Sequence, residues 1–415
     1  CQVVSMSVRA AKDGSDRGWR WNRLPFQARR LRSTFRDVER SSVHDVVVVG
    51  ASAAGLAVAA SLKARGIDAV LLEQHEHVGH AWRNHYARLH LHTSGGLSGL
   101  PGFPMPKSYP RYPSRQQVVD YLEAYREHFD LQPRYGQTVK SVRRGGDSWL
   151  VETTTDLFRA RRVVVATGYT RQPVRPRWPG MDDYAGELLH SSEYSSGARF
   201  SGSRVLVVGF GNSACEIAID LVEQGAEPSL AVRGPVNVVP RDVFGIPILG
   251  VGIAMSFLPA KVADVLGKPI VAVSVGNIED VGLRRLPYGP NVQIREHGRI
   301  PLLDIGTIDL IRKEKISVRP GIESFHEEGV VFVDGRREDF AAVVLGTGYR
   351  PALAEFVSVE DIDAKTGSHE GSGYRLDDDL YLCGLYVSPT GMLREIGIEA
   401  ARIAEDVSRR SAANC

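Results

Sequence analysis

The sequence predicts an α/β protein with two Rossmann-like dinucleotide-binding domains, one inserted in the other. The first observation is a run of β-branched residues at 44–49 that ends at a glycine and leads into an Ala- and Leu-rich stretch. The second is a repeat of this pattern at 204–232, about 160 residues later. The third is a pair of apolar runs, 162–165 and 341–345, that both end in a Gly-Thr-Gly-like turn. Each of the two repeats is a strand–turn–helix–strand unit of nucleotide-binding type.

In the first repeat, His44–Val49 has the composition of a fully buried parallel strand. Ala51–Arg65 predicts a helix, which Gly66 ends. Ile67–Leu72 predicts a second strand, and Glu73 follows it directly.

The turn between that strand and helix reads Gly-Ala-Ser-Ala-Ala-Gly, a G-x-G-x-x-G motif with Ser52 at the middle glycine. Gly50 permits the tight turn, the middle position lets backbone approach a pyrophosphate, and Gly55 allows close packing of helix on strand. Glu73 lies about 20 residues on, where an acid accepts hydrogen bonds from ribose hydroxyls and disfavours a 2′-phosphate. A glycine-rich turn with a chance acid is the alternative. The context favours an FAD or NAD site that includes Gly50, Ser52, Ala53, Ala54, Gly55 and Glu73.

Between the repeats, Gln116–His128 predicts an amphipathic helix. Short strands of a meander are expected at Gln137–Arg143, Ser148–Thr153 and Leu157–Arg159, and a buried strand at Arg162–Val165.

In the second repeat, strands are expected at Arg204–Val208 and Pro228–Val232, with a helix at Asn212–Gln224 between them. The turn reads Gly-Phe-Gly-Asn-Ser-Ala, in which the final Ala is permitted. Here Arg233 takes the place that Glu73 has in the first repeat. A cation there pairs with a 2′-phosphate, which indicates NADP; a solvated cation at a strand end is the alternative. The predicted NADPH residues are Gly209, Gly211, Asn212, Ser213 and Arg233, with Arg241 as a second candidate for the phosphate.

Residues 243–276 form an apolar segment interrupted by Pro247, Pro259 and Pro269. Its apolar composition predicts buried helices packed over a site. A membrane-surface contact or a hydrophobic substrate lid stays open as the alternative. Later in the chain, strands are expected at Ala341–Leu345 and Leu380–Cys383 and a terminal helix at Ile396–Ser408.

Composition and charge restrict the partners. Residues 1–43 hold nine Arg and one Lys against four acids, and we expect this stretch to be a disordered or idle extension. The rest of the chain has more acidic than basic residues, so no nucleic acid is expected. The four cysteines are widely spaced without a CxxC, which argues against a disulfide framework and suits the cytoplasm. No apolar run is long enough for a transmembrane segment. The histidines from His75 to His92 have no regular ligand spacing, and no metal is expected.

Several further segments give the chain its resemblance to a known family. Residues 44–408 resemble the class B flavin-dependent monooxygenases, which include flavin-containing monooxygenases, Baeyer–Villiger enzymes and the plant YUCCA group. The segment Gly79–Trp82 resembles the family's GGxW, Tyr184–Tyr194 its FxGxxxHxxx[YF] motif, and Gly346–Arg350 its ATGY segment. The runs that resemble YUCCA proteins are Arg88–Pro101, Val238–Arg241, Leu283–Pro290 and Pro301–Ile311.

The chain departs from the family's pattern at several positions. His80 replaces a Gly of GGxW, Tyr184 replaces a Phe, and Gly346 replaces an Ala. The stretch His92–Gly96 lacks the Asn that other flavin-containing monooxygenases place near the flavin, as YUCCA proteins also do. Gly95 stands where YUCCA proteins have a Lys, so this stretch differs from the subfamily's pattern.

The resemblance implies an NADPH-dependent FAD monooxygenase that inserts one oxygen atom from O2 through a C4a-hydroperoxyflavin. For a YUCCA-like enzyme it implies oxidative decarboxylation of an aromatic α-keto acid such as indole-3-pyruvate. Three alternatives stay open: Baeyer–Villiger or N/S-oxygenation, an H2O2-forming NADPH oxidase or reductase, and a flavin-binding sensor without turnover. The implied partners are a small-molecule substrate and O2; the oligomeric state stays open, with a homodimer as one option.

The resemblance also implies further flavin contacts and a domain order. Trp82 and His92 are candidates for the flavin edge, and no catalytic acid or base is assigned. The additional flavin-binding candidates are Gly79, Trp82, Arg83, His92, Gly384 and Leu393. The expected FAD domain is discontinuous, residues 44–170 and 335–415, with the NADPH domain at 171–334.

Overall fold

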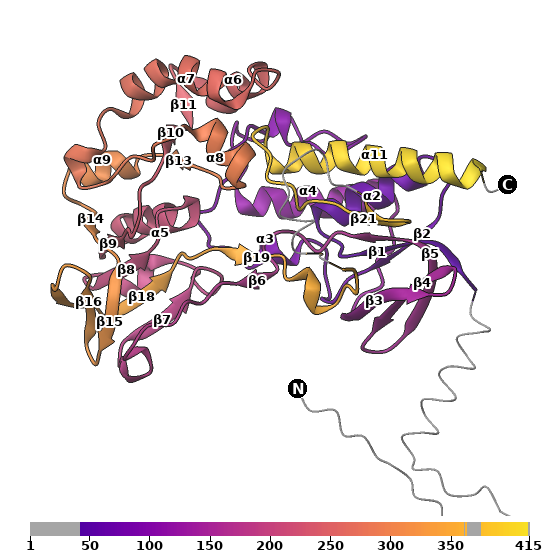
Figure 1. The fold of residues 1–415 in the computed structure, drawn as a ribbon, viewed down its shortest axis with the longest axis horizontal. Coiled ribbons are helices and arrows are strands. Elements are labelled where there is room, and N and C mark those ends of the chain that lie inside the picture. The colour runs from indigo at the N-terminus through magenta and orange to yellow at the C-terminus, as the bar shows by residue number, and fades with distance from the viewer. Residues whose placement is uncertain (1–41, 361, 363–374, 414–415) are drawn as a thin grey trace, which may run out of the picture. The chain divides into compact units, whose positions relative to one another are not determined.

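The computed structural model describes residues 42–360, 362 and 375–413. Almost all of the expected extension at 1–43 therefore lies outside the described residues. From Val43 onward the chain forms one compact unit. It contains one mixed sheet with a parallel centre and one fully parallel sheet. We call each of these two sheets, together with its helices, a lobe (Figure 1).

The first lobe is built on a seven-stranded sheet whose central order is β2-β1-β5-β21-β20. Strands β1 and β2 pair in parallel, with Val46 opposite Ala69, and β1 also pairs with β5 in parallel. Strand β4 joins β5 in an antiparallel pair and adds β3. The strands are β1 (His44–Val49), β2 (Ala69–Leu72), β3 (Val139–Gly145), β4 (Ser148–Thr153), β5 (Leu157–Val165), β20 (Arg375–Asp377) and β21 (Leu380–Leu382).

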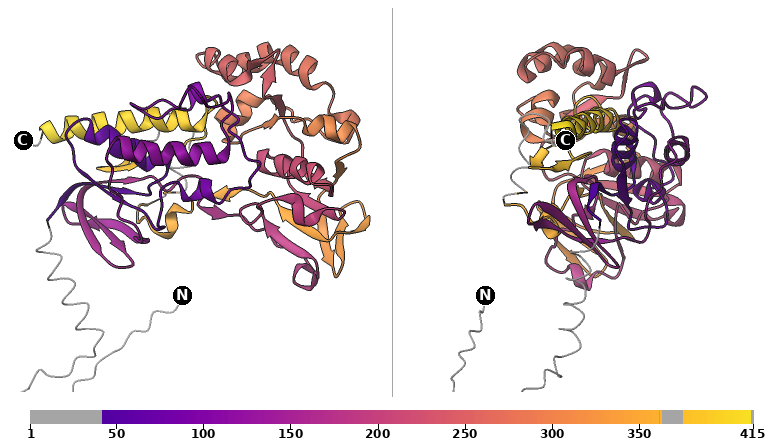
Figure 2. Two further views of the ribbon diagram at one scale, coloured as in Figure 1. Left: turned by 180° about the vertical axis from the view of Figure 1, so that it is seen from behind. Right: turned by 90° about the vertical axis from the view of Figure 1, so that its right-hand side faces the viewer.

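Helices α2 (Ala53–Lys63), α4 (Arg115–His128) and α11 (Met392–Ala413) cover one face of this sheet (Figures 1 and 2). Helix α11 lies alongside α2, although the two are more than 300 residues apart in the chain. Fully buried Val46, Leu56 and Ile403 belong to the core between them. This packing brings the C-terminal helix against the helix that follows the first glycine turn.

The second lobe has a five-stranded parallel sheet of order β14-β9-β8-β18-β7. Helix α5 (Asn212–Glu223) packs against it, and a three-stranded antiparallel sheet completes the lobe. The strands are β7 (Glu187–His190), β8 (Arg204–Val208), β9 (Glu227–Ala231), β14 (Ser317–Arg319), β15 (Ile322–His326), β16 (Gly329–Phe332), β17 (Arg337–Asp339) and β18 (Ala342–Leu345).

The chain leaves the first lobe and returns to it along one short ribbon. Strand β6 (Gln172–Pro173) pairs antiparallel with β19 (Tyr349–Arg350). The second lobe therefore lies between residues 174 and 348 of the chain, inserted in the first as predicted. The expected boundary at residue 335 is too early, because β17 and β18 pair within the second lobe.

Most expected elements are present within a few residues of their predicted ends. The expected strands Leu157–Arg159 and Arg162–Val165 are one continuous strand, β5, because it pairs with β4 at one end and with β1 at the other. The terminal helix begins at Met392, earlier than predicted.

The apolar segment 243–276 forms β11 (Asp242–Val243), β12 (Ile246–Pro247), α6 (Ile248–Ala254) and α7 (Ala260–Val275). The prediction of buried helices is wrong here. Helix α6 buries no residue, α7 buries only Ala263 and Val275, and Phe257 is 80% exposed. Nevertheless, no helix in the described part of the chain is long and apolar enough to cross a membrane.

Five further short elements complete the described chain; of these, α8 and β10 contact α7, and β13 and α9 contact α5. They are α3 (His80–Arg83), β10 (Val238–Pro240), α8 (Pro290–His297), β13 (Leu302–Asp304) and α9 (Thr307–Arg312).

Candidate functional site

The first glycine turn has a backbone that requires glycine at both ends of the motif. Gly50 has φ +102°, and a Cβ there would lie 2.7 Å from the Ala166 carbonyl oxygen. A Cβ on Gly55 would lie 1.7 Å from the Gly50 carbonyl oxygen. Side chains at these positions are therefore excluded, and α2 starts directly at the end of β1.

Ser52 is compatible with this turn, although it replaces the motif's middle glycine. It is the N-cap residue of α2, with an extended backbone (φ −97°) that any residue can adopt. Its side chain makes no capping hydrogen bond. The first N–H groups of α2 are thus left for an anionic ligand, as in other nucleotide-binding turns.

Glu73 connects the end of β2 to this turn. Its Oε2 accepts a hydrogen bond from the Ala51 N–H at 2.8 Å, and its Oε1 accepts from the His75 N–H at 3.0 Å. The side chain is almost fully buried, yet it lines a cavity. The acid predicted from spacing therefore lies beside the glycine turn.

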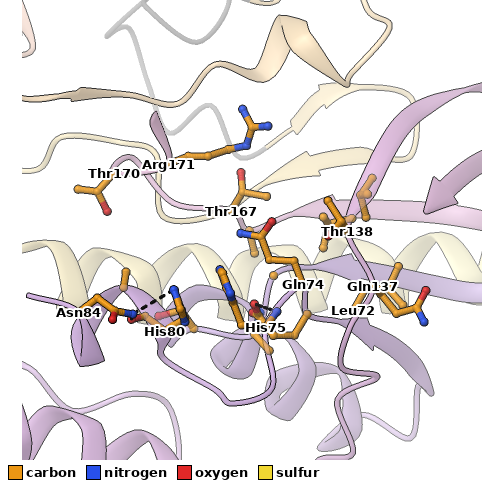
Figure 3. A pocket seen from close by; sticks show the side chains of 18 of the residues that line it. Leu72, Gln74, His75, His80, Asn84, Gln137, Thr138, Thr167, Thr170 and Arg171 are labelled. Atoms are coloured by element: carbon orange, nitrogen blue, oxygen red, sulfur yellow. Dashed lines mark hydrogen bonds between the residues drawn. The ribbon is translucent and has the colours of Figure 1, made fainter. Parts of the chain in front are cut away.

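That cavity has a volume of about 500 Å³, within the usual range for small-molecule sites. Its walls combine the glycine turn, the residues after β2, the start of α3 and the turn after β5. In Figure 3, Thr167, Thr170 and Arg171 lie opposite His75, His80 and Asn84. The Thr167 hydroxyl is buried without a partner among the described residues. A glycine cradle, a ribose-directed acid and an unsatisfied hydroxyl together fit an adenine dinucleotide.

Two histidines at this cavity stack on each other. The rings of His75 and His80 lie 3.2 Å apart and almost parallel. Burial lowers the pKa of the His80 ring below its ordinary value, and the positive charge of nearby Arg83 contributes to this shift. Among the described residues no group of three or more His, Cys, Asp or Glu could hold a metal.

The second glycine turn repeats the geometry at the end of β8. Gly209 has φ +118°, and a Cβ there would lie 2.5 Å from the Gly346 carbonyl oxygen. A Cβ on Gly211, in contrast, would meet no atom within 4 Å. Packing against the protein thus explains why residue 209 is a glycine. At Gly211 the space is open, so that a pyrophosphate can approach the protein backbone. Asn212 accepts a hydrogen bond from the Leu303 N–H at 2.9 Å and ties this turn to β13.

Arg233 lies exposed at the end of β9, as predicted, and a second cation lies next to it. Arg284 donates a hydrogen bond to the Arg233 carbonyl oxygen at 3.1 Å. Neither guanidinium has an ion pair with a described residue. Sequence reasoning missed Arg284, because 51 residues separate the two and no local pattern joins them. Arg241, the other candidate, instead pairs with Asp242 at 3.1 Å and stacks over Tyr112 at 4.0 Å.

The segment from His85 to His92 runs between the two lobes. Tyr86 is buried in the core of the second lobe, whereas Leu91 belongs to the core of the first. His92 contacts the buried carboxylate of Glu216 on α5. Desolvation in this segment lowers the pKa of His85.

The other predicted flavin residues lie outside the lining of the cavity described above. Gly79 has φ +67° and precedes α3, where Trp82 packs against the first core and Arg83 pairs with Glu123. Gly384, with φ +78°, donates its N–H to Glu399, and Leu393 is buried on α11. Their contact with a flavin stays a prediction.

Comparisons with known proteins agree with this architecture. A profile of the pyridine nucleotide-disulphide oxidoreductase family matches residues 47–242. The chain is 34% identical over 384 residues to the probable indole-3-pyruvate monooxygenase YUCCA3 of Arabidopsis thaliana, covering 89% of this chain and 87% of that protein. It is 41% identical over 313 residues to the indole-3-pyruvate monooxygenase YUCCA1 of Oryza sativa subsp. japonica, covering 74% and 77%.

Solved structures show the same fold. A flavin-containing monooxygenase from Stenotrophomonas maltophilia matches with a TM-score of 0.69 at 25% identity, covering 89% of this chain and 100% of that one. The structure of OTEMO in complex with FAD and NADP matches with a TM-score of 0.70 at 17% identity, covering 90% and 87%. At that identity the second match supports the fold alone.

Proposed function

The chain belongs to the flavin-containing monooxygenase family and, within it, to the YUCCA-like group, and from this we propose that it acts on an aromatic α-keto acid such as indole-3-pyruvate. The enzyme is an FAD- and NADPH-dependent monooxygenase. The observation that carries the substrate proposal is 41% identity to a relative named for that substrate. When bound, FAD would supply the acceptor for a hydride from NADPH and the chemistry that activates O2.

We assign the first glycine turn to FAD. The N-terminus of α2 would hold the pyrophosphate, since Ser52 leaves its N–H groups free of a side-chain cap. The Glu73 carboxylate would accept hydrogen bonds from a ribose while keeping the Ala51 N–H in place. Thr167 would satisfy its buried hydroxyl on the same ligand.

The second turn supports an NADPH site. The open space at Gly211 would admit the pyrophosphate, with Gly209, Asn212 and Ser213 shaping the turn. Arg233 and Arg284 would together pair with the 2′-phosphate, because both are cations without an acidic partner in the described part. A carboxylate at the first site and two cations at the second explain how one chain separates the two dinucleotides.

We propose that α6 is the substrate lid that the sequence left as an alternative. A Cβ on Gly391, just before α11, would lie 3.0 Å from Thr93 and 3.4 Å from Leu249 of α6. Helix α6 therefore lies beside the residues that precede α11, and Thr93, which follows His92, lies next to the same Gly391. An apolar cover at this place suits an aromatic substrate and keeps water from the reacting atoms.

The proposal also covers the cell compartment and the substrates of the enzyme. Cys215 and Cys383 are buried free thiols, which suits the reducing cytoplasm that the sequence predicts. The substrate is a small molecule, and O2 is the second substrate.

Product analysis with 18O2 tests the proposed reaction. Purified enzyme with NADPH and indole-3-pyruvate should release CO2 and give indole-3-acetate that carries one 18O per NADPH consumed. A panel of ketones and of amines or sulfides tests Baeyer–Villiger and N/S-oxygenation in the same assay. NADPH consumption matched by H2O2, with no labelled product from any substrate, would show an oxidase instead.

A further inference from the structure

The two lobes are joined by a buried contact between one histidine and one carboxylate. Nε2 of His92, from the segment after α3, lies in hydrogen-bond contact with Oε1 of Glu216 on α5. The side chain of Glu216 is 2% exposed and that of His92 is 14% exposed. The partners are 124 residues apart in the chain, so only the folded arrangement of the lobes creates the contact.

The buried negative charge of Glu216 needs hydrogen-bond donors or positive charges beside it, and the segment between the two lobes supplies them. Besides the His92 ring, the Arg88 guanidinium lies close to this carboxylate, with its Nη1 3.8 Å from Oε2 of Glu216. The same Arg88 makes two hydrogen bonds to Glu223, at 2.8 and 2.9 Å. Both His92 and Arg88 belong to the segment that runs between the two lobes. Removing one partner of such a pair leaves an uncompensated buried charge, which is strongly destabilising.

The remaining carboxylate on this part of α5 behaves differently. Asp220 accepts hydrogen bonds from the Tyr194 hydroxyl at 2.6 Å and from the Gly197 N–H at 2.7 Å. Both donors belong to the second lobe. Glu216 is thus the buried acid of α5 whose Oε1 is contacted from the segment between the lobes, while its Oε2 makes no hydrogen bond to a described residue. It lies about one turn after the NADPH glycine turn.

We infer that Glu216 is a positioning residue that fixes the NADPH turn relative to the flavin edge by holding His92. The inference rests on the proposed assignment of the two turns to FAD and NADPH. Hydride transfer between two separately bound dinucleotides depends on their relative placement, and a displacement of about 1 Å can reduce a rate about 100-fold. A buried side-chain contact in the first turns of α5 restrains that placement directly.

The second ring nitrogen of His92 supports this role. Its Nδ1 is buried and has no hydrogen-bond partner among the described residues. With Nε2 directed at Glu216, Nδ1 is left for a bound ligand, as an acceptor in the neutral ring or a donor in the imidazolium. Glu216 therefore sets which nitrogen His92 presents as well as where the ring lies.

The test compares Glu216→Gln, His92→Gln and the double variant with a matched control on the same helix. The control is Glu223→Gln, which removes a charge that pairs with the same segment but is half exposed. Each protein is loaded with FAD, and three quantities are measured: the Kd of NADP+ by calorimetry, the limiting rate of anaerobic flavin reduction at saturating NADPH, and hydrogen exchange without nucleotide.

We expect Glu216→Gln to keep its FAD and to lower the limiting reduction rate by about 10- to 100-fold. Hydrogen exchange should be faster than in wild type in both peptides, the one that covers 86–94 and the one that covers 212–223. The flavin of the double variant should be reduced no more slowly than the flavin of the slower single variant, because the two side chains act as one unit. The control should stay within about twofold of the wild type, as surface ion pairs contribute little.

A reduction rate of Glu216→Gln within about twofold of wild type overturns the inference, even if the protein melts earlier, because a merely structural role lowers stability and spares the rate of the folded fraction. Should Glu216→Gln fail to fold, the same criterion applies to His92→Gln. A wild-type protein that takes up no FAD, or whose flavin NADPH does not reduce, would instead refute the proposed function.

Discussion

Oε2 of Glu73 accepts a hydrogen bond from the backbone N–H of Ala51 at 2.8 Å. The acid after β2 and the turn after β1 are therefore joined into one structural unit. Parallel pairing of β1 with β2 places their carboxyl ends side by side, with Val49 opposite Leu72. The pairing brings an acid about 20 residues away in sequence into the mouth of the glycine turn.

Glu73→Ala should abolish stable FAD binding, while Glu73→Gln should weaken it less. The alanine leaves the buried Ala51 N–H without an acceptor, at a cost of about 1–3 kcal/mol, and removes the ribose acceptor. The glutamine keeps an amide oxygen that can accept a hydrogen bond from either the Ala51 N–H or the ribose hydroxyl. The measurement is the ratio of flavin to protein absorbance after desalting. Full flavin content in Glu73→Ala would remove the assignment of this turn to FAD.

Arg233→Ala and Arg284→Ala should each lower kcat/KM for NADPH by about 10- to 100-fold, the usual contribution of a charge-assisted hydrogen bond. The values for NADH should barely change, since NADH has no 2′-phosphate. Arg285→Ala is the matched control, because Arg285 adjoins Arg284 but donates to the Gly276 carbonyl oxygen. Equal losses with NADPH and NADH in Arg284→Ala would restrict the phosphate site to Arg233.

The contrast between these two arginines shows how far the sequence could predict the site. Glu73 and Arg233 were predictable because each ends the second strand of a local unit, so spacing alone locates them. Arg284 and Glu216 have no such local signal, since their partners are 51 and 124 residues away and meet only through tertiary packing. The boundary at 335 failed for the same reason: an apolar run predicts a strand but does not say which sheet it joins.

The apolar segment 243–276 shows a second limit. Its composition indicates burial, yet Phe244, Phe257 and Val273 are among the most exposed large apolar side chains described. Apolar composition reports a preference for leaving water, and it does not identify the surface that will be covered.

Gly211→Ala and Gly209→Ala should separate binding from folding at the second turn. A methyl group at 211 meets no protein atom within 4 Å, so the variant should melt within a few degrees of wild type but bind NADP+ at least about 10-fold more weakly. Gly209→Ala combines φ +118° with a 2.5 Å contact to the Gly346 carbonyl oxygen, and should lose about 1–3 kcal/mol of stability. Thermal melts and NADP+ calorimetry on both proteins check this. Unchanged NADP+ affinity in Gly211→Ala would contradict the assignment of the open space.

Glu399 on α11 should make stability depend on pH near neutrality. Burial raises its pKa to about 7, and the nearby Glu395 adds to this, while the hydrogen bond from the Gly384 N–H opposes it. In the unfolded chain the group titrates near the ordinary value for Glu, about 4.3. Between the unfolded pKa and the folded pKa, the folded protein binds one proton more at Glu399 than the unfolded chain does. The stabilisation is therefore complete below the unfolded pKa and is lost as pH rises through about 7.

Glu399→Gln mimics the protonated side chain at every pH and still offers an oxygen to the Gly384 N–H. We expect the variant to exceed wild type in stability by a small margin at pH 5 and by a larger one at pH 8, the margin growing by on the order of 2–3 kcal/mol at most between these pH values. Chemical denaturation at both pH values measures the difference. Glu395→Gln is a useful comparison, because Glu395 is a neighbouring acid on α11 that accepts hydrogen bonds from Ser388 and Thr390. If Glu399→Gln and wild type lose stability in parallel between pH 5 and 8, the buried carboxyl at Gly384 does not titrate in this range.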